Sequence, residues 1–169
     1  YSMEFDGSSL IDLGDITMLN GVSQASYSFW FKLSSYTPVS GSSAVMLVGS
    51  NAKGASCYIY NNNFYIHNFN TQYILASSGV PSLNEWHHVC GVFNSGVTVA
   101  YLDGVSVGTV TDATLTTTAS DFGDNYNIGY SSFYSAYMNA NGQIDGLSFF
   151  NYALTDGTGG SVNQISTLY

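Results

Sequence analysis

Residues 84–109 of the chain read NEWHHVCGVFNSGVTVAYLDGVSVGT, and this stretch predicts three short strands joined by two tight turns. Apolar residues recur at every second position in three runs, which are residues 86–93, 97–102 and 105–110. Asp103-Gly104 separates the last two runs, and Asn94-Ser95-Gly96 separates the first two. An Asp-Gly link between alternating runs is typical of a type I′ hairpin turn, in which both central residues have positive φ. The stretch therefore indicates an antiparallel sheet.

Further strands are expected on both sides of this stretch. They are residues 2–6, 10–13, 27–33, 45–48, 57–60, 64–69, 73–76, 125–130 and 143–150. In the strand 27–33, alternation places Tyr27, Phe29, Phe31 and Leu33 on one face and Ser28, Trp30 and Lys32 on the other. Residues 57–69 are expected to form a hairpin across Asn61-Asn62-Asn63, because Asn tolerates left-handed backbone.

The end of the chain differs from the rest. Ser161 and Gln164 have the spacing of a capping box, which predicts a short helix over residues 161–168. Many short strands with one short helix predict an all-β fold, a two-sheet antiparallel sandwich that occupies residues 1–169 as a single domain.

Charge and composition exclude several function classes. Only 8% of the residues are charged, the formal net charge is −9, and the only basic side chains besides histidine are Lys32 and Lys53. Nucleic acid is excluded as a partner because phosphate binding depends on Lys and Arg, and an anionic membrane surface is disfavoured for the same reason. The chain contains no run of 18 apolar residues, so the sequence predicts no membrane-spanning helix. Richness in Ser, Thr, Asn, Gly and Tyr favours an extracellular, cell-surface or virion-surface protein, and the start at Tyr1 suggests a processed chain or an excerpt.

Four motifs follow one another along the chain in a recognisable order. They are Phe5-Asp6-Gly7, Ser28-Phe29-Trp30-Phe31, Trp86-His87-His88-Val89 with the Tyr101-Leu102-Asp103-Gly104 hairpin, and the closing segment from Ile144 to Leu154. In this order, and with a terminal short helix, they resemble the laminin G-like branch of the concanavalin A-like lectin/glucanase superfamily. The resemblance implies a jelly-roll sandwich and a sugar-binding or adhesive module. The chain departs from the family pattern at Gly146, where an acid is usual, and at Cys90, where Ala is usual.

Catalysis is not expected. Glucanases of the family that the chain resembles carry their carboxylates as Glu-x-Asp-x-x-Glu, and Glu4-Phe5-Asp6 matches only its start, because Ser9 stands at the last position. Asp6 is better explained as the acid of a turn. His87 and His88 are adjacent on one strand and should point to opposite faces, and His88 is expected to be a core histidine beside Trp86. We therefore expect a protein that is not an enzyme.

A structural Ca²⁺ ion is considered between the first and last strands, as in related sandwich modules. Alternation places Asp145 on the same face as Leu147 and Phe149, which would turn its carboxylate inward, where it needs amide donors or a cation. Asp6 and Asp145 would be the protein carboxylates, and backbone and Asn oxygens could complete the coordination. The alternative is that Asp145 accepts backbone amides. The loop with Asp121 and Asp124 is a second candidate, although such residues are commonly turn formers.

The two cysteines leave two alternatives open. Cys57 and Cys90 both fall within expected strands, so they either form one disulfide or are buried thiols that act as small hydrophobes.

Aromatic side chains make up 15% of the chain and predict a binding surface. Tyrosine suits sugars, because its ring packs on apolar C–H groups while its hydroxyl makes hydrogen bonds. The candidate ligand-binding residues lie in the 57–69 hairpin and in the loop 130–137. They are Tyr58, Tyr60, Tyr65, His67, Tyr130, Phe133, Tyr134 and Tyr137. Strand propensity alone would also place tyrosines on an exposed face.

Two functions therefore remain in view. The first is a lectin-like module that binds glycans or mediates adhesion. The second is a structural subunit of an extracellular filament, fibre or shell. Lysine, which commonly prevents exposed sheet edges from pairing with another chain, is almost absent from this chain. Other copies of the chain would be the partners in that case, as a homo-oligomer.

Overall fold

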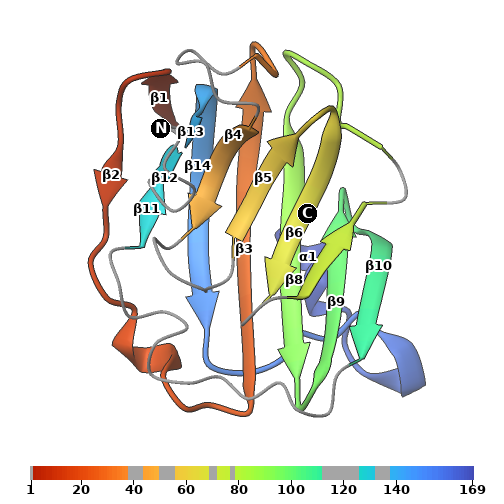
Figure 1. Ribbon diagram of the computed structural model, residues 1–169. Coiled ribbons are helices and arrows are strands. Elements are labelled where there is room, and N and C mark those ends of the chain that lie inside the picture. Colours follow the sequence, from red (N-terminus) through yellow and green to blue (C-terminus); the bar gives the residue numbers. More distant parts are fainter. Residues whose placement is uncertain are drawn as a thin grey trace.

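The computed structural model describes residues 2–37, 44–49, 56–68, 72–76, 79–111, 126–131 and 138–169. Two six-stranded antiparallel sheets, A and B, lie face to face, with the short helix α1 behind sheet A in the view of Figure 1. This arrangement confirms the predicted all-β sandwich. None of the helices formed by these residues has the length and apolar character needed to span a membrane.

The two sheets combine strands that are distant in sequence. Sheet A has the order β1 (Met3–Asp6), β14 (Asn141–Phe150), β3 (Gln24–Leu33), β8 (His87–Asn94), β9 (Val97–Leu102) and β10 (Val105–Thr111). Sheet B has the order β2 (Ile11–Asp12), β11 (Asn127–Ile128), β4 (Ala44–Gly49), β5 (Ser56–Tyr60), β6 (Asn63–Asn68) and β7 (Gln72–Leu75). The remaining elements are the ribbon of β12 (Tyr130–Ser131) and β13 (Met138–Asn139), the 3-10 turns Thr17–Leu19 and Thr158–Gly160, and α1 (Gln164–Leu168).

Alternation along β3 builds the centre of the core. Tyr27, Phe29, Phe31 and Leu33 point between the sheets and are at most 1% exposed, as predicted. Inward side chains of β5 and β6 complete this layer, among them Cys57, Ile59, Phe64 and Ile66. Burial of this many large apolar side chains is the main source of the sandwich's stability.

The predicted turns are confirmed at the backbone level. Asn61 and Asn62 have φ of 48° and 57° between β5 and β6, while Asn63 already belongs to β6. Asp103 and Gly104 have φ of 50° and 75° between β9 and β10. Positive φ at both central residues is the type I′ geometry that matches the twist of the flanking strands.

Some predicted boundaries are wrong. The expected strand 125–130 is divided into β11 and β12 by Gly129, where a Cβ atom would lie 2.4 Å from the ring of Phe5. The predicted capping box does not form, because α1 begins at Gln164 and its cap is Asn163, whose Oδ1 accepts the backbone amide of Ser166 at 2.8 Å. The Gln164 side chain instead accepts the backbone amide of Thr155 at 3.2 Å.

The cysteines are buried, free and in different layers. Cys57 belongs to the cluster between the two sheets, whereas Cys90 lies on the outer face of sheet A. Burial raises the pKa of the Cys90 thiol to about 12. The buried-thiol alternative is therefore correct.

The chain after β14 covers the outer face of sheet A. Leu154 and Ile165 pack there with Cys90, Val92 and Tyr101 in a second apolar cluster. Ser26 of β3 anchors this segment, since its hydroxyl donates to the carbonyl of Tyr152 at 2.9 Å and accepts the amide of Leu154 at 3.0 Å. We call residues 151–169 the C-terminal segment.

Candidate functional site

Three predicted site residues form one aromatic patch on the outer face of sheet B. The rings of Tyr58 and Tyr65, which are cross-strand partners on β5 and β6, stack with centroids 5.2 Å apart and planes 17° from parallel. Tyr60 lies beside them, with its ring centroid 6.5 Å from that of Tyr65, and is 41% exposed. Their inward neighbours Cys57 and Ile59 are buried, so the alternation that predicted this patch is confirmed. We call Tyr58, Tyr60 and Tyr65 the tyrosine face.

The side chains of the other predicted ligand-binding residues lie outside what the structure describes. His67 lies on β6 and Tyr130 on β12, but only their backbones are described. Phe133, Tyr134 and Tyr137 lie outside the described residues, as does the loop with Asp121 and Asp124.

His87 and His88 point to opposite sides of sheet A, as expected. His88 is fully buried beside Trp30, with ring centroids 5.1 Å apart, and its Nε2 lies 2.8 Å from the Ser28 hydroxyl. The ring of Tyr169 is a second aromatic neighbour of His88. The predicted neighbour Trp86 is instead 40% exposed. Burial lowers the pKa of His88, which keeps the ring neutral near pH 7.

His87 belongs to a hydrogen-bonded clamp at the β9–β10 turn. Its Nδ1 lies 2.7 Å from Asp103 Oδ2, and its Nε2 lies 3.0 Å from the Ser82 hydroxyl. Asp103 also accepts the backbone amide of His88 at 2.8 Å, while the Ser82 hydroxyl donates to Glu85. Ser82, His87 and Asp103 thus follow one another as in a catalytic Ser-His-Asp triad. The Ser82 hydroxyl, however, donates its hydrogen bond to the Glu85 carboxylate. The clamp ties the start of β8 to the turn.

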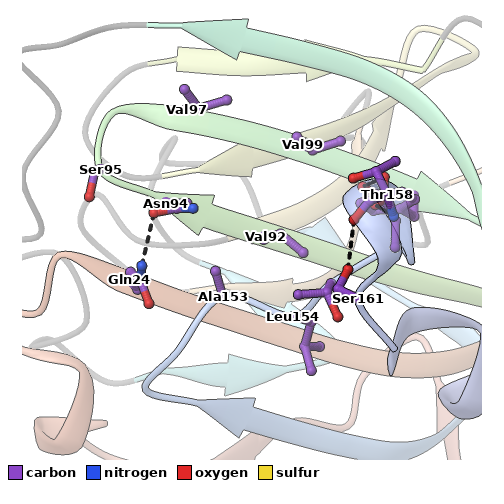
Figure 2. Close-up of a pocket in the computed structure, with 13 residues that line it drawn as sticks. Gln24, Val92, Asn94, Ser95, Val97, Val99, Ala153, Leu154, Thr158 and Ser161 are labelled. Atoms are coloured by element: carbon purple, nitrogen blue, oxygen red, sulfur yellow. Dashed lines mark hydrogen bonds between the residues drawn. The ribbon is translucent and has the colours of Figure 1, made fainter. Parts of the chain in front are cut away.

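A groove lies between the outer face of sheet A and the C-terminal segment (Figure 2). Its volume is about 710 Å³, and its floor consists of the apolar side chains Val92 and Val99 with Ala153 and Leu154 from the segment. Volumes of about 300–1,000 Å³ are usual for sites that hold small molecules.

Polar groups stand at both ends of the groove. At one end Gln24 Nε2 donates to Asn94 Oδ1 at 3.0 Å, the bond drawn in Figure 2. At the other end the Tyr101 hydroxyl donates to Asp156 at 3.1 Å. The Thr158 backbone amide donates to Asp156 and is the main cause of that residue's lowered pKa, so the carboxylate is ionised at neutral pH.

The chain matches a known family over most of its length. Residues 5–158 match the family described as the concanavalin A-like lectin/glucanases superfamily. The chain belongs to this superfamily. No curated protein is significantly similar to it in sequence.

Solved structures with this superfamily's sandwich include carbohydrate-binding modules. The CBM40 of a Ruminococcus gnavus IT-sialidase bound to α2,3-sialyllactose superposes with a TM-score of 0.75 at 15% identity, over 99% of this chain and 96% of that one. Domain 4 of AbnA, a GH43 extracellular arabinanase from Geobacillus stearothermophilus in complex with arabinotriose, gives 0.69 at 18% identity, over 99% and 75%. A heptameric SAP-like pentraxin from Limulus polyphemus gives 0.64 at 17%, over 99% and 80%. Identities this low show a shared fold alone.

The carboxylates that the superfamily resemblance suggested as calcium ligands do not fit a shared ion. Asp6 pairs with Asn141, whereas Asp145 lies four positions further along β14, which is about 13 Å at the rise of a strand. Asp6 accepts four hydrogen bonds from the amides and hydroxyls of Ser8 and Ser9. Asp6 is therefore the acid of a turn, as the sequence predicts.

The inward orientation predicted for Asp145 is wrong. A bulge follows it in β14, with Gly146 at φ 63°, and shifts the alternation by one position. Asp145 pairs with Trp30 and accepts the amide of Gly146 at 2.8 Å, so it points away from the core that Leu147 and Phe149 contact. Within the described residues no three His, Cys, Asp or Glu side chains converge as a metal site would need.

Sequence reasoning missed the groove. Its polar residues Gln24, Asn94 and Asp156 come from three distant parts of the chain. The pairing of β3 with β8 brings Gln24 to Asn94, and the return of the C-terminal segment adds Asp156. One signal was available: Leu154, Ile165 and Leu168 form an apolar set after the last strand, and such a set needs a surface to cover.

Proposed function

We propose that the chain is a non-catalytic module that binds glycans outside the cell through the tyrosine face. The single observation that carries the proposal is the stacked pair of Tyr58 and Tyr65 with the exposed Tyr60 beside it. A tyrosine ring offers a flat apolar surface to sugar C–H groups, and tyrosine also carries a hydroxyl that can hydrogen-bond to a ligand.

Membership in a superfamily of lectins and glucanases supports this proposal. Two of the similar structures are named as a carbohydrate-binding module with sialyllactose and as an enzyme domain with arabinotriose. Ser9 stands where the glucanase motif Glu-x-Asp-x-x-Glu has its last glutamate, and its hydroxyl donates to Asp6. The missing carboxylate supports a role without catalysis. A low content of charged residues together with abundant Ser, Thr, Asn and Tyr supports an extracellular location.

A glycan array probed with the purified chain tests the proposal, followed by titration of the strongest ligand. Tyr60→Ala is expected to weaken binding about 2- to 13-fold, the equivalent of ~0.5–1.5 kcal/mol for an aromatic contact. Tyr60→Phe, which keeps the ring, should retain most of the affinity.

The matched control is Tyr152→Ala. Tyr152 is 43% exposed, close to the 41% of Tyr60, but lies on the C-terminal segment and not on the tyrosine face. Equal losses for Tyr60→Ala and Tyr152→Ala, or no array signal at all, would contradict the proposal.

A second function, self-association, is favoured by the β10 edge. β10 ends sheet A, and its seven residues include no charge and no proline, while Val105 is 67% exposed. Uncharged edge strands readily pair with another copy. Sedimentation of the chain and of Thr109→Lys tests this: assembly that the lysine abolishes supports a fibre or shell subunit, and a monomer at all concentrations refutes it.

A further inference from the structure

We propose that the groove under the C-terminal segment is a second carbohydrate site, and that it accepts uncharged oligosaccharides and rejects sialylated ones. The inference rests on the proposed glycan-binding function but concerns the opposite side of the sandwich. The tyrosine face lies on the outside of sheet B, whereas the groove lies on the outside of sheet A.

The groove has the two-part character of a sugar site. Its floor of Val92 and Val99 matches the apolar C–H face of a pyranose ring, and polar groups stand at its two ends (Figure 2). A volume of about 710 Å³ holds a short oligosaccharide, within the usual range of about 300–1,000 Å³ for small-molecule sites.

The amide pair at one end is arranged for neighbouring hydroxyl groups. The Gln24–Asn94 hydrogen bond uses one N–H of Gln24 and the carbonyl oxygen of Asn94. The Asn94 NH₂ group and the Gln24 carbonyl then remain for a ligand, because both side chains are solvent-exposed. One donor beside one acceptor matches a vicinal diol, which can accept from the first and donate to the second.

The other end of the groove determines which ligand charge is tolerated. The Asp156 carboxylate is ionised and is bonded to Tyr101 and Thr158, so it offers a hydroxyl only acceptor capacity. Among the described residues that line the groove none is Lys or Arg, and the whole chain contains two lysines and no arginine. A sialic acid carboxylate would therefore meet a like charge without a cation, and like-charge juxtaposition is strongly unfavourable.

Amide NMR titrations of the full chain test the inference with three probes: lactose, arabinotriose and α2,3-sialyllactose. Lactose and sialyllactose differ only by the sialic acid. We expect lactose or arabinotriose to shift the side-chain amides of Gln24 and Asn94 and the backbone of β8 and β9. Sialyllactose should leave these signals unchanged.

The variant Asn94→Asp tests the role of the Asn94 NH₂ group. It preserves the acceptor for Gln24 but removes the outward NH₂ donors, and it should weaken neutral-sugar binding about 2- to 13-fold. Asn151→Asp adds the same charge at an exposed position that does not line the groove, and should have no effect. Thermal unfolding of both variants checks that the fold is retained.

The outcomes separate the two proposals. Shifts confined to β5 and β6 would overturn the groove site and leave the proposed function standing. Groove shifts with sialyllactose that equal those with lactose would overturn the charge selectivity. No shift with any probe, together with an empty glycan array, would overturn both.

Discussion

The core leaves no room for a side chain at Gly91. This glycine is the cross-strand partner of Tyr27, and a Cβ atom at Gly91 would lie 2.4 Å from Tyr27 Cε1. The Tyr27 ring is 1% exposed and stacks on Phe29, so it has little room to move. Gly91→Ala is therefore expected to destabilise the fold by about 1–3 kcal/mol or more, as overpacked cores do. Urea unfolding monitored by fluorescence measures this.

Gly14→Ala is the control for this substitution. Gly14 has φ +64° with no atom within 4 Å of the added Cβ, so the variant carries only the backbone cost of about 1–2 kcal/mol. A Gly91→Ala protein as stable as the wild type would show that Tyr27 can move aside.

Asp6 makes the stability of the first turn depend on pH. The backbone amide of Ser8, followed by the hydroxyls of Ser8 and Ser9, holds the Asp6 pKa far below its usual value. A lowered pKa in the folded state stabilises the fold above the unfolded pKa of about 3.9, and this contribution is lost as pH falls toward the folded pKa. The stability difference between wild type and Asp6→Asn should therefore shrink on acidification below pH about 4.

The carboxyl carbon chemical shift of Asp6, followed by NMR against pH, measures the pKa directly. A midpoint at or above about 3.9 would contradict this role of the serine donors.

At the scale of elements, the C-terminal segment is held by packing and not by its own helix. α1 has five residues, far fewer than the ~12–15 that an isolated helix needs. Ile165 is 1% exposed and anchors the helix in the second cluster beside Leu154 and Cys90. Ile165→Ala should destabilise this region by about 2–5 kcal/mol, as buried large-to-small changes do.

Hydrogen exchange is the measurement for Ile165→Ala. Amides of the C-terminal segment should exchange faster, while those of β5 and β6 stay protected, because the two clusters lie on opposite sides of sheet A. Uniform acceleration in all strands would show instead that the segment and the sandwich unfold as one unit.

At the scale of the whole molecule, the two buried thiols should become reactive through different opening motions of the fold. Cys57 lies between the sheets and Cys90 lies under the C-terminal segment, and burial raises the pKa of both. Reaction of Cys57 should require global unfolding, whereas Cys90 should react whenever the segment lifts. The single-thiol variants Cys90→Ala and Cys57→Ala, timed with a thiol reagent, separate these rates.

We expect Cys90 to react faster than Cys57, and both to react far more slowly than in urea. Equal rates for the two thiols in native buffer would mean that lifting of the segment and separation of the sheets are a single event.

Local sequence was informative wherever one face of a strand is buried and the other is not. The alternation in β3 and β5 predicted correctly which tyrosines and phenylalanines point inward, and Asp103-Gly104 predicted its turn. Alternation failed at Asp145, because the bulge at Gly146 adds a residue that a strict period of two does not include. It also predicted the start of β3 too late, since Ser26 is polar yet buried against the C-terminal segment.

Short-range patterns were sufficient to predict the sandwich, its hairpins and the tyrosine face, because these depend on period-two alternation and on turn residues that act over a few positions. The groove, the separation of Asp6 from Asp145 and the neighbours of His88 became visible only in the folded chain. Each of these depends on which distant segments become neighbours, as when Gln24, Asn94 and Asp156 come to line one groove. Contacts of that kind follow from strand order, bulges and the packing of the whole chain, which short-range patterns do not encode.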